Sequence, residues 1–569
     1  MARPSFPSMQ WPAMLVRRLI FFAILLLTTI GLTALMWSVL APGGWTVAKA
    51  LLLACFIGVA PWLGVCLGNA LPGFLILVLA RHPARTVLPV DGDIDSAPIT
   101  ARTALAVTIR NEDMALVLPP LRRLLEGLAD SDRFALFILS DTQDPALVAA
   151  EEAAIAAFPL PVRYRRRAAN TGFKAGNVMD FLDHHAVGFD FVLTLDADSE
   201  MTPAAVRCLV RIMQAAPRMG IVQHLTAGRP AASAFPRLFQ FGMRAGMRVW
   251  SIGQGWWQDD AGPYWGHNAI LRIAPFRAHC RLQPLPDGSP ILSHDQVEAA
   301  RLRAAGWGVC VWADDDGSLE ANPPALPEFL HRDARWLAGN LQYRHLLVMP
   351  GLRPMGRWQL MQAILLFAGA PLYNAMLALA AIAAATGDTA DFPRGRLLAL
   401  ALAWTLILYA PKLLGYAETL IFRARSARYG GRARFAAGAA AEFAFTLLLD
   451  ALSYPTKTLA MLRLALGARP GWLPQNRSDR GVGWAEAARM FWPHTLFGTA
   501  VFALLAWSSW PMALWALPFA GGLLVSVPFC VATSDPRLSA WLRRRRIAAT
   551  PEELAGNQPC NGPPTYSTP

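Results

Sequence analysis

The sequence predicts an α/β domain with a mixed, mostly parallel sheet, inserted between two groups of apolar helices. Charged residues make up 16% of the chain and hydrophobic residues 54%, with a mean hydropathy of +0.33. Soluble domains average about 25% charged residues, so this composition is typical of a membrane protein. The carboxylates gather in the middle of the chain, where short apolar strands alternate with helical patterns. That alternation favours an open sheet with helices on both faces.

Apolar runs long enough to cross a bilayer flank this middle region on both sides. Arginines at their ends indicate that the middle domain and both termini are cytoplasmic. The segment 435–466 is also apolar but is broken by Glu442, Asp450, Pro455 and Lys457, so it is either a helical hairpin or a pair of interfacial helices. The chain then has six spans, or eight if this segment crosses. The six are 19–40, 47–80, 360–385, 397–421, 495–510 and 512–531.

The same pattern divides the chain into successive parts. A polar stretch near 468–490, with Trp472, Gln475, Asn476 and Arg477, is expected to be a cytoplasmic loop that closes over the domain's site. The C-terminal tail is Pro-rich and polar and is predicted to be disordered. The expected parts are a cytoplasmic N-terminus at 1–16, two transmembrane helices within 17–80, the cytoplasmic α/β domain at 81–350, four to six further spans with interfacial segments within 351–534, and the cytoplasmic tail at 535–569.

The net charge of +13 does not indicate a nucleic-acid partner. The basic residues stand beside apolar runs rather than in one patch with aromatic residues, which is typical of membrane anchors. Seven cysteines without paired spacing indicate neither a zinc site nor a disulfide framework. Arginine fills almost every cationic position, and lysine occurs only at Lys49, Lys174, Lys412 and Lys457. Lys174 lies in the polar domain, so either it is retained by chance or its role needs a compact ammonium group.

Polar residues follow the predicted strands of the middle domain. Ligands of open parallel sheets bind at the carboxyl ends of the strands. Asn111 and Glu112 follow the first strand, Asp141 the second, and Asp196 and Asp198 the fourth. We therefore expect these side chains to share a site. The predicted strands are 105–109, 134–140, 162–165, 191–195 and 220–223, and the predicted helices are 114–128, 146–157, 174–185 and 203–216.

The Asp196-x-Asp198 pair is a candidate cation site. Carboxylates at i and i+2 on an extended strand end point to the same side. Their oxygens suit Mg²⁺ or Mn²⁺ shared with a diphosphate. The alternative is a capping pair before the helix that begins near Pro203. The position directly after an apolar strand favours the cation site.

Two later motifs carry candidate catalytic residues. Asp295, in Ser293-His294-Asp295, is a candidate general base, and the lesser alternative is that Ser293 simply caps a helix. Arg332 and Arg335 share a helix face, where they are placed to meet a leaving diphosphate. Trp336 offers an aromatic wall for a sugar. The alternative for this second motif is a solvated helix with a buried tryptophan.

Taken together, these residues resemble the processive inverting glycosyltransferases of family 2, which include cellulose synthase. Their marks are spaced aspartates, an Asp-x-Asp, a Thr-Glu-Asp-like base, a Lys-Ala-Gly-Asn segment and a Gln-x-x-Arg-Trp box, where this chain has Arg332 in place of Gln. The resemblance implies a nucleotide-sugar-binding sheet of the GT-A type. It implies a base at Asp295, a metal at Asp198 and Asp196, and donor-binding residues Asn111, Glu112, Asp141, Lys174, Asp196, Arg332 and Arg335.

Longer strings are similar to the glucans biosynthesis glucosyltransferase H subfamily, at 264–270, 291–295, 304–309 and 332–341. That resemblance implies UDP-glucose as donor, a β-linked product (β-1,2 in the well-known cases) for osmoregulated periplasmic glucans, and the inner membrane of Gram-negative bacteria. Its implied partners are the growing glucan, the bilayer and a periplasmic glucan-biosynthesis protein. The alternatives are a cellulose or hyaluronan synthase, and a transporter or flippase whose polar domain only binds nucleotide. The implied acceptor-binding residues are Gly266, His267, Asn268 and Trp336.

Overall fold

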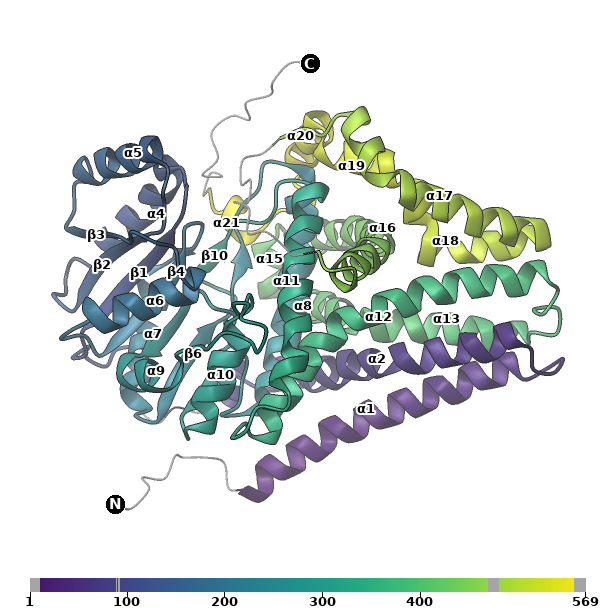
Figure 1. The fold of residues 1–569 in the computed structure, drawn as a ribbon, viewed down its shortest axis with the longest axis horizontal. Helices are drawn as coiled ribbons and strands as arrows, with labels where there is room; N and C mark the ends of the chain where they lie inside the picture. The colour runs from purple at the N-terminus through teal and green to yellow at the C-terminus, as the bar shows by residue number, and fades with distance from the viewer. Residues whose placement is uncertain (1–10, 89, 91–92, 469–479, 557–569) are drawn as a thin grey trace.

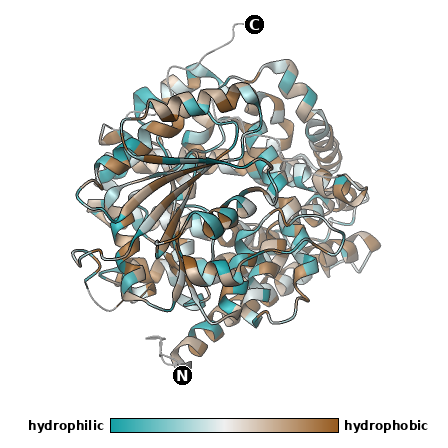
Figure 2. Ribbon diagram, turned by 60° about the vertical axis from the view of Figure 1, so that its left-hand side comes forward, coloured by the Kyte–Doolittle hydropathy of each residue, from teal (hydrophilic) through white to brown (hydrophobic). Residues whose placement is uncertain are grey.

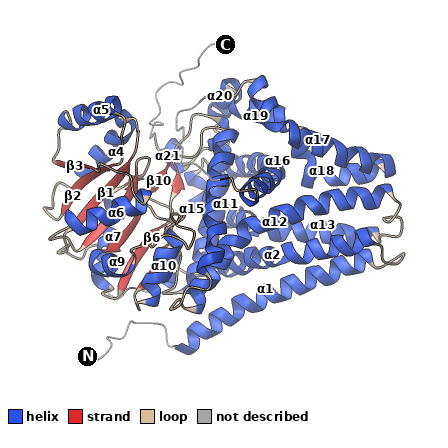
Figure 3. Ribbon diagram, in the orientation of Figure 1, coloured by secondary structure: helices blue, strands red, loops and turns tan. Residues whose placement is uncertain are grey.

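The computed structural model describes residues 11–88, 90, 93–468 and 480–556. An α/β domain lies on one side of the molecule and a bundle of long helices on the other (Figure 1). The strands of the described residues all belong to the α/β domain, and the bundle is built of helices alone (Figure 3). The predicted insertion of a sheet domain between two groups of helices is thus what the structure shows.

The main sheet has seven strands, in the order β3-β2-β1-β4-β8-β6-β9. Neighbouring strands are parallel, except that β8 runs antiparallel to both β4 and β6. Strands β1 and β4, at its centre, are almost fully buried, and several strands of the sheet have the brown colour of hydrophobic residues in Figure 2. The strands are β1 (Thr103–Ile109), β2 (Phe134–Ser140), β3 (Val162–Arg166), β4 (Phe191–Asp196), β6 (Met219–His224), β8 (Ala269–Arg272) and β9 (Gly308–Trp312).

Helices cover both faces of this sheet. Helices α4 (Met114–Glu126) and α7 (Pro203–Ala215) pack on one face, and α6 (Phe173–His184), α9 (Ile273–His279) and α10 (Asp295–Ala304) pack on the other. Helix α5 follows β2 and precedes β3. All five predicted strands and four predicted helices are present, with ends shifted by at most two residues. This domain also contains α5 (Pro145–Ala156), α3 (Pro83–Val87) and a small sheet of β5 (Glu200–Met201), β10 (Ser318–Glu320) and β7 (Ala227–Gly228).

Among the described residues, five helices are long and apolar enough to cross a membrane, or up to seven if each of two bent pairs is one span. The first pair, α13 and α14, bends by 70°, and the second, α18 and α19, bends by 62°. The predicted apolar runs outside 435–466 all fall on these helices. They are α1 (Trp11–Leu40), α2 (Val47–Leu79), α12 (Pro354–Ala385), α13 (Arg394–Leu408), α14 (Ala410–Ile421), α16 (Arg432–Ala465), α17 (Trp484–Ser508), α18 (Trp510–Leu524) and α19 (Ser526–Ser534).

The prediction of two helices for 435–466 is wrong. The segment forms one continuous helix, α16, of 34 residues. Its polar side chains do not break it because other elements supply partners: Tyr409 donates to Asp450, and Lys457 pairs with Asp333. Figure 1 shows α16 end-on, whereas α1, α2, α12 and α17 lie lengthwise. Helix α16 therefore crosses the others at a steep angle.

The prediction of a disordered tail is wrong for residues 535–556. Helix α20 (Pro536–Arg545) and the short α21 (Pro551–Leu554) continue the fold there. Residues 548–550 are almost fully buried, and Nη1 of the buried Arg237 lies 2.7 Å from Glu553. The acidic residues, which favour disorder by composition, are here neutralised by arginines. Residues 557–569 lie outside the described part of the chain, as do 1–10.

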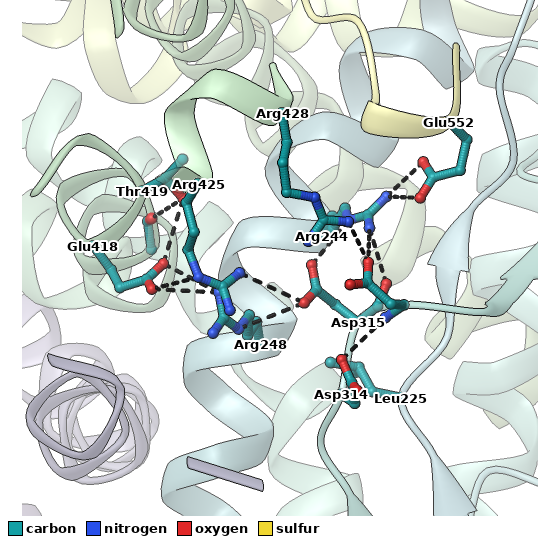
Figure 4. A network of polar contacts seen from close by, with 12 residues as sticks. Leu225, Arg244, Arg248, Asp314, Asp315, Glu418, Thr419, Arg425, Arg428 and Glu552 are labelled. Atoms are coloured by element: carbon teal, nitrogen blue, oxygen red, sulfur yellow. Dashed lines mark hydrogen bonds and ion pairs between the residues drawn. The ribbon is translucent and has the colours of Figure 1, made fainter. Parts of the chain in front are cut away.

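Helix α8 (Ala234–Gln258) joins the α/β domain to the helical bundle. It packs against α2, α14 and α16 and presents buried arginines to carboxylates from several segments (Figure 4). Arg244 binds Glu552, at 2.7 Å, and Asp315 in the loop between β9 and β10, at 3.1 Å. Arg248 lies 3.3 Å from Glu418 of α14. Buried ion pairs thus tie the loop before β10, α14 and the C-terminal segment to one helix, with further contacts from α15 (Arg423–Arg428).

Candidate active site

The carboxyl ends of β1 and β4 lie side by side, and several of the predicted donor-binding residues meet there. Asp196 is the last residue of β4, and its carboxylate pairs with Nζ of Lys174 at the start of α6. Thr108, near the end of β1, lies 3.4 Å from the same carboxylate oxygen. Asp198 follows in the turn between β4 and β5. The structure thus brings Lys174 into direct contact with the Asp-x-Asp turn.

Asp141 follows β2 and is held by an arginine that sequence analysis missed. Arg167 donates from Nε and Nη2 to the two carboxylate oxygens of Asp141, both at 2.7 Å. It also donates to the backbone carbonyls of Thr171 and Phe173, at 2.9 and 3.1 Å. Arg167 therefore fixes the turn that delivers Lys174. Its position directly after β3 is the signal that would have found it.

The turns after β1 and β2 are joined to each other. Asn111 adopts a left-handed backbone conformation with φ +57°, and its N–H donates to Oγ1 of Thr142 at 2.8 Å. Thr142 in turn donates to the buried carboxylate of Glu151 on α5, which also accepts from Ser140 at 2.7 Å. Glu112 follows Asn111 on this turn. This arrangement fixes the backbone at the predicted donor edge of the sheet.

Glu320 on β10 is a third carboxylate of the site, and sequence analysis missed it. Its Oε2 lies 3.4 Å from Nε2 of His267. Burial raises the pKa of Glu320, and the negative charges of Asp198 and Asp196 raise it further. The positive charges of His267 and Arg332 oppose this rise in pKa. Glu320 therefore faces both the Asp-x-Asp turn and the arginine motif. A three-residue strand with no apolar pattern gives little sequence signal.

Helix α11 (Leu326–Leu346) carries the arginine-tryptophan motif beside these carboxylates. The guanidinium of Arg332 lies 4.6 Å from the ring centre of Trp336. Burial lowers the pKa of Arg332, and Glu320, Asp333 and Asp198 oppose that shift. Trp336 is 48% exposed. The alternative of a solvated helix with a buried tryptophan therefore does not hold. Arg335 occupies the next helical turn from Arg332.

The loop before β8 contains three of the predicted acceptor-binding residues, and these three differ in their contacts. Gly266 has φ +83° and lies against α10, where a Cβ would be 3.5 Å from Cβ of Asp295. His267 reaches Glu320. Asn268 is fully buried, and its amide donates to Ser318 of β10 at 2.8 Å. Asn268 thereby holds the loop before β8 to β10, and its contact with an acceptor sugar stays a prediction.

Asp295 is the first residue of α10, and α11 packs directly against the turn before it. A Cβ on Gly339 of α11 would lie 2.9 Å from the backbone nitrogen of Ser293. Tyr343, also on α11, donates to the carbonyl of Ser293 at 3.0 Å. The preceding His294 pairs with Glu298 at 2.8 Å. The turn that carries the candidate base Asp295 is thus held between α11 and the loop of Gly266.

The donor set fits a divalent cation shared with a diphosphate. Asp196 and Asp198 offer the hard oxygen ligands that Mg²⁺ or Mn²⁺ takes, and Glu320 faces them. Among the described residues, no cluster of three or more His, Cys, Asp or Glu side chains is arranged to hold an ion by itself. Mg²⁺ commonly takes one or two carboxylates and completes its shell with phosphate oxygens and water. The set therefore suits a cation that arrives with its substrate.

The loop of 468–490 is described only at its ends. Trp472, Gln475, Asn476 and Arg477 lie outside the described residues. Arg480 lies 2.7 Å from Glu328 of α11 and 2.8 Å from Glu486. Val482 donates its backbone N–H to Ser534 at 3.0 Å. The described end of this loop is therefore anchored to the helix that carries Arg332.

Comparison with known proteins identifies the family. Residues 191–417 match a family model described as glycosyl transferase family group 2. The chain is 34% identical to glucans biosynthesis glucosyltransferase H of Pseudomonas putida strain F1, over 89% of this chain and 62% of that protein. It is 34% identical to the protein of the same name from Bradyrhizobium diazoefficiens strain USDA 110, over 97% of this chain and 79% of that one.

The chain spans 62% of the length of the Pseudomonas putida relative. Among solved structures, a mannosyltransferase from Pyrobaculum calidifontis, in complex with GDP-mannose and Mn²⁺, aligns with 63% of this chain and 99% of its own at 17% identity and a TM-score of 0.39. The mostly parallel sheet described above, together with the family match at residues 191–417, is that of a GT-A-like glycosyltransferase domain. The chain belongs to the glucans biosynthesis glucosyltransferase H family and carries a family 2 glycosyltransferase domain.

Proposed function

We propose that this protein is an inverting, processive glucosyltransferase. It polymerises glucose from UDP-glucose into the β-linked backbone of osmoregulated periplasmic glucans. The linkage that we propose is β-1,2. One observation carries the proposal: Lys174 pairs with Asp196 and also acts electrostatically on His294 and Glu298 of α10. The Asp-x-Asp turn and the turn that carries the candidate base Asp295 thus both lie within electrostatic reach of one ammonium group. Membership of the family supports the same reading.

The donor half of the mechanism follows from the charges at the sheet edge. Asp141 and the turn held by Arg167 bind the uridine, and Asn111 and Glu112 line the same edge. Mg²⁺ or Mn²⁺, held by Asp198 and Asp196, would neutralise the diphosphate when bound. Lys174, Arg332 and Arg335 place positive charge where negative charge develops on UDP as it leaves, which stabilises the transition state.

The acceptor half places a base opposite the leaving group. Asp295 takes the proton of the acceptor hydroxyl as that oxygen attacks the anomeric carbon. The C–O bond to UDP breaks as the new C–O bond forms, so an α-linked donor gives a β-linked product. Trp336, half exposed, is the wall on which the acceptor sugar stacks, and Gly266 and His267 shape the opposite side.

We propose that the enzyme lies in the inner membrane with its α/β domain and both termini in the cytoplasm. Helices α1, α2, α12 and α17 and the two bent pairs then make six spans, which returns the chain to its starting side. Helix α16 lies crosswise between these helices and the α/β domain. A glucan does not partition into lipid, so the spans after the domain pass it across the bilayer. A periplasmic glucan-biosynthesis protein is the expected receiver.

The proposal is tested with inverted membrane vesicles that contain this protein. Radiolabelled UDP-glucose and Mg²⁺ are added, and labelled polymer and released UDP are measured, with and without a chelator. Polymer and UDP formed together, and lost with the chelator, support the proposal. UDP-glucose binding with neither product, in a protein shown to be folded, contradicts it. Linkage analysis of the polymer separates a β-1,2-glucan from the product of a cellulose or hyaluronan synthase.

Replacing Lys174 with methionine should lower polymer synthesis by about 100-fold, since loss of one group that stabilises developing charge costs about this much. The ammonium contacts Asp196, so UDP affinity should fall as well. Turnover with UDP-glucose and calorimetric UDP binding measure the two effects. Lys174→Arg keeps the charge and should retain part of the activity. Wild-type turnover in the methionine variant would contradict the role of Lys174.

A further inference from the structure

A buried histidine–carboxylate pair lies next to Asp295, and the mechanism above does not use it. His294 precedes α10, and its Nδ1 lies 2.8 Å from Oε2 of Glu298, one helical turn further on. The Glu298 side chain is 3% exposed and that of His294 16%. A buried carboxylate is costly unless it is paired, so this pair is a fixed feature of the site.

The pair fixes the direction of the imidazole ring. A carboxylate accepts hydrogen bonds, so Nδ1 is the donor and carries a hydrogen. The opposite nitrogen, Nε2, faces the loop of Gly266, where a Cβ would lie 3.7 Å from Nε2. None of the hydrogen bonds formed among the described residues uses this nitrogen. The ring therefore presents one unused polar atom between the acceptor loop and Asp295.

The charges around the ring favour its protonated form. The titratable groups that face the pair are Asp295 on α10 and Lys174 on α6, and Tyr264, Cys280 and Tyr343 face its carboxylate side. Burial alone lowers the pKa of His294, but the Glu298 and Asp295 carboxylates outweigh it and raise the pKa above its ordinary value, against Lys174. A protonated imidazole carries a hydrogen on both nitrogens, so Nε2 is a donor.

We propose that His294, held by Glu298, donates a hydrogen bond from Nε2 to the acceptor end of the growing glucan and so positions the attacking hydroxyl against Asp295. The sugar oxygen that accepts this bond is a neighbour of the reacting hydroxyl, whose proton goes to Asp295. Glu298 is a positioning residue that acts through His294. The inference rests on the proposed function and adds a sugar-binding residue to it.

The test measures glucosyl transfer from UDP-glucose to a short β-1,2-linked glucose oligosaccharide, as a function of oligosaccharide concentration. Glu298→Gln and His294→Leu should lower kcat/KM for the oligosaccharide about 10- to 100-fold, the range expected for a lost hydrogen bond from a charged donor. His294→Gln keeps an amide donor and should recover part of the loss. UDP affinity, measured by calorimetry, should stay at the wild-type value in all three.

The pH profile separates positioning from simple helix capping. Transfer by the wild type should fall as pH rises through the raised pKa of His294, because the imidazole then loses the hydrogen that Nε2 donates. Glu298→Gln removes the negative charge that raises this pKa, so the fall should begin at lower pH. The matched control is Asp180→Asn, which removes the negative partner of the exposed His184 on α6 at the same helical spacing. Its profile should match that of the wild type.

The outcomes are distinct. No transfer by the wild type overturns the proposed function itself. Transfer by the wild type together with unchanged kcat/KM and an unchanged pH profile in Glu298→Gln overturns this inference alone. Equal losses in His294→Gln and His294→Leu, with UDP affinity retained and no pH shift in Glu298→Gln, also overturn it, because a pair that only holds α10 gives that result.

Discussion

Replacing Asp295 with asparagine is expected to lower polymer synthesis by a factor of about 100 to 10,000, the range attributed to a general base. Asparagine has nearly the same shape, so the turn held by Tyr343 and Gly339 should persist. It cannot accept the proton of the acceptor hydroxyl, however. Because the loss is in proton transfer, kcat should fall while UDP affinity is retained. Turnover of radiolabelled UDP-glucose and calorimetric UDP binding measure the two quantities.

The matched control is Asp287→Asn. Asp287 lies eight residues before Asp295, in an exposed turn where it accepts from Ser289. This variant should retain wild-type synthesis. Polymer made by Asp295→Asn at more than about a tenth of the wild-type rate would remove Asp295 from the role of base. It would leave the donor site and the membership of the family untouched.

The sheet and its carboxyl-end residues were predictable because they depend on local pattern. Apolar strands such as β1 and β4 sit at the centre of the sheet and are buried on both faces, so their composition alone indicates them. The rarity of lysine was equally informative. Each of the four lysines forms a specific contact, as Lys174 does with Asp196 and Lys49 does with the backbone carbonyls of Pro42 and Gly44.

What sequence reasoning missed depends on partners distant in the chain. Glu320 joins the site only because the three residues of β10 pair with β5 and β7. Helix α16 stays continuous because Lys412, 30 residues earlier in the chain, pairs with Glu442. A local sequence pattern does not reveal a pairing over that separation. Glu552 and its neighbour are ordered by buried arginines of α8, more than 300 residues earlier.

The junction of α2 with α8 leads to the second prediction of a large effect, this time on stability. At the crossing of these helices, a Cβ on Gly253 of α8 would overlap the backbone oxygen of Asn69, and a Cβ on Gly73 of α2 would overlap that of Val249. The two backbones are in direct contact, and the indole N–H of Trp257 donates to Asn69 at 2.8 Å beside them. No side-chain rotation relieves such an overlap.

Gly253→Ala should therefore force α8 away from α2 and lower the free energy of unfolding by about 3 kcal/mol or more, as overpacking of a close interface does. Thermal unfolding in detergent, followed by tryptophan fluorescence, measures the change. Gly31→Ala is the matched control, because Gly31 lies in helix α1 with no atom within 4 Å of the position that a Cβ would occupy, and alanine is the better helix former there. Equal melting temperatures for the two variants would show that the α/β domain is not fastened to the helical bundle at this crossing. A low melting temperature for Gly253→Ala alone would show that the direct backbone contact between α2 and α8 fastens the α/β domain to the helical bundle.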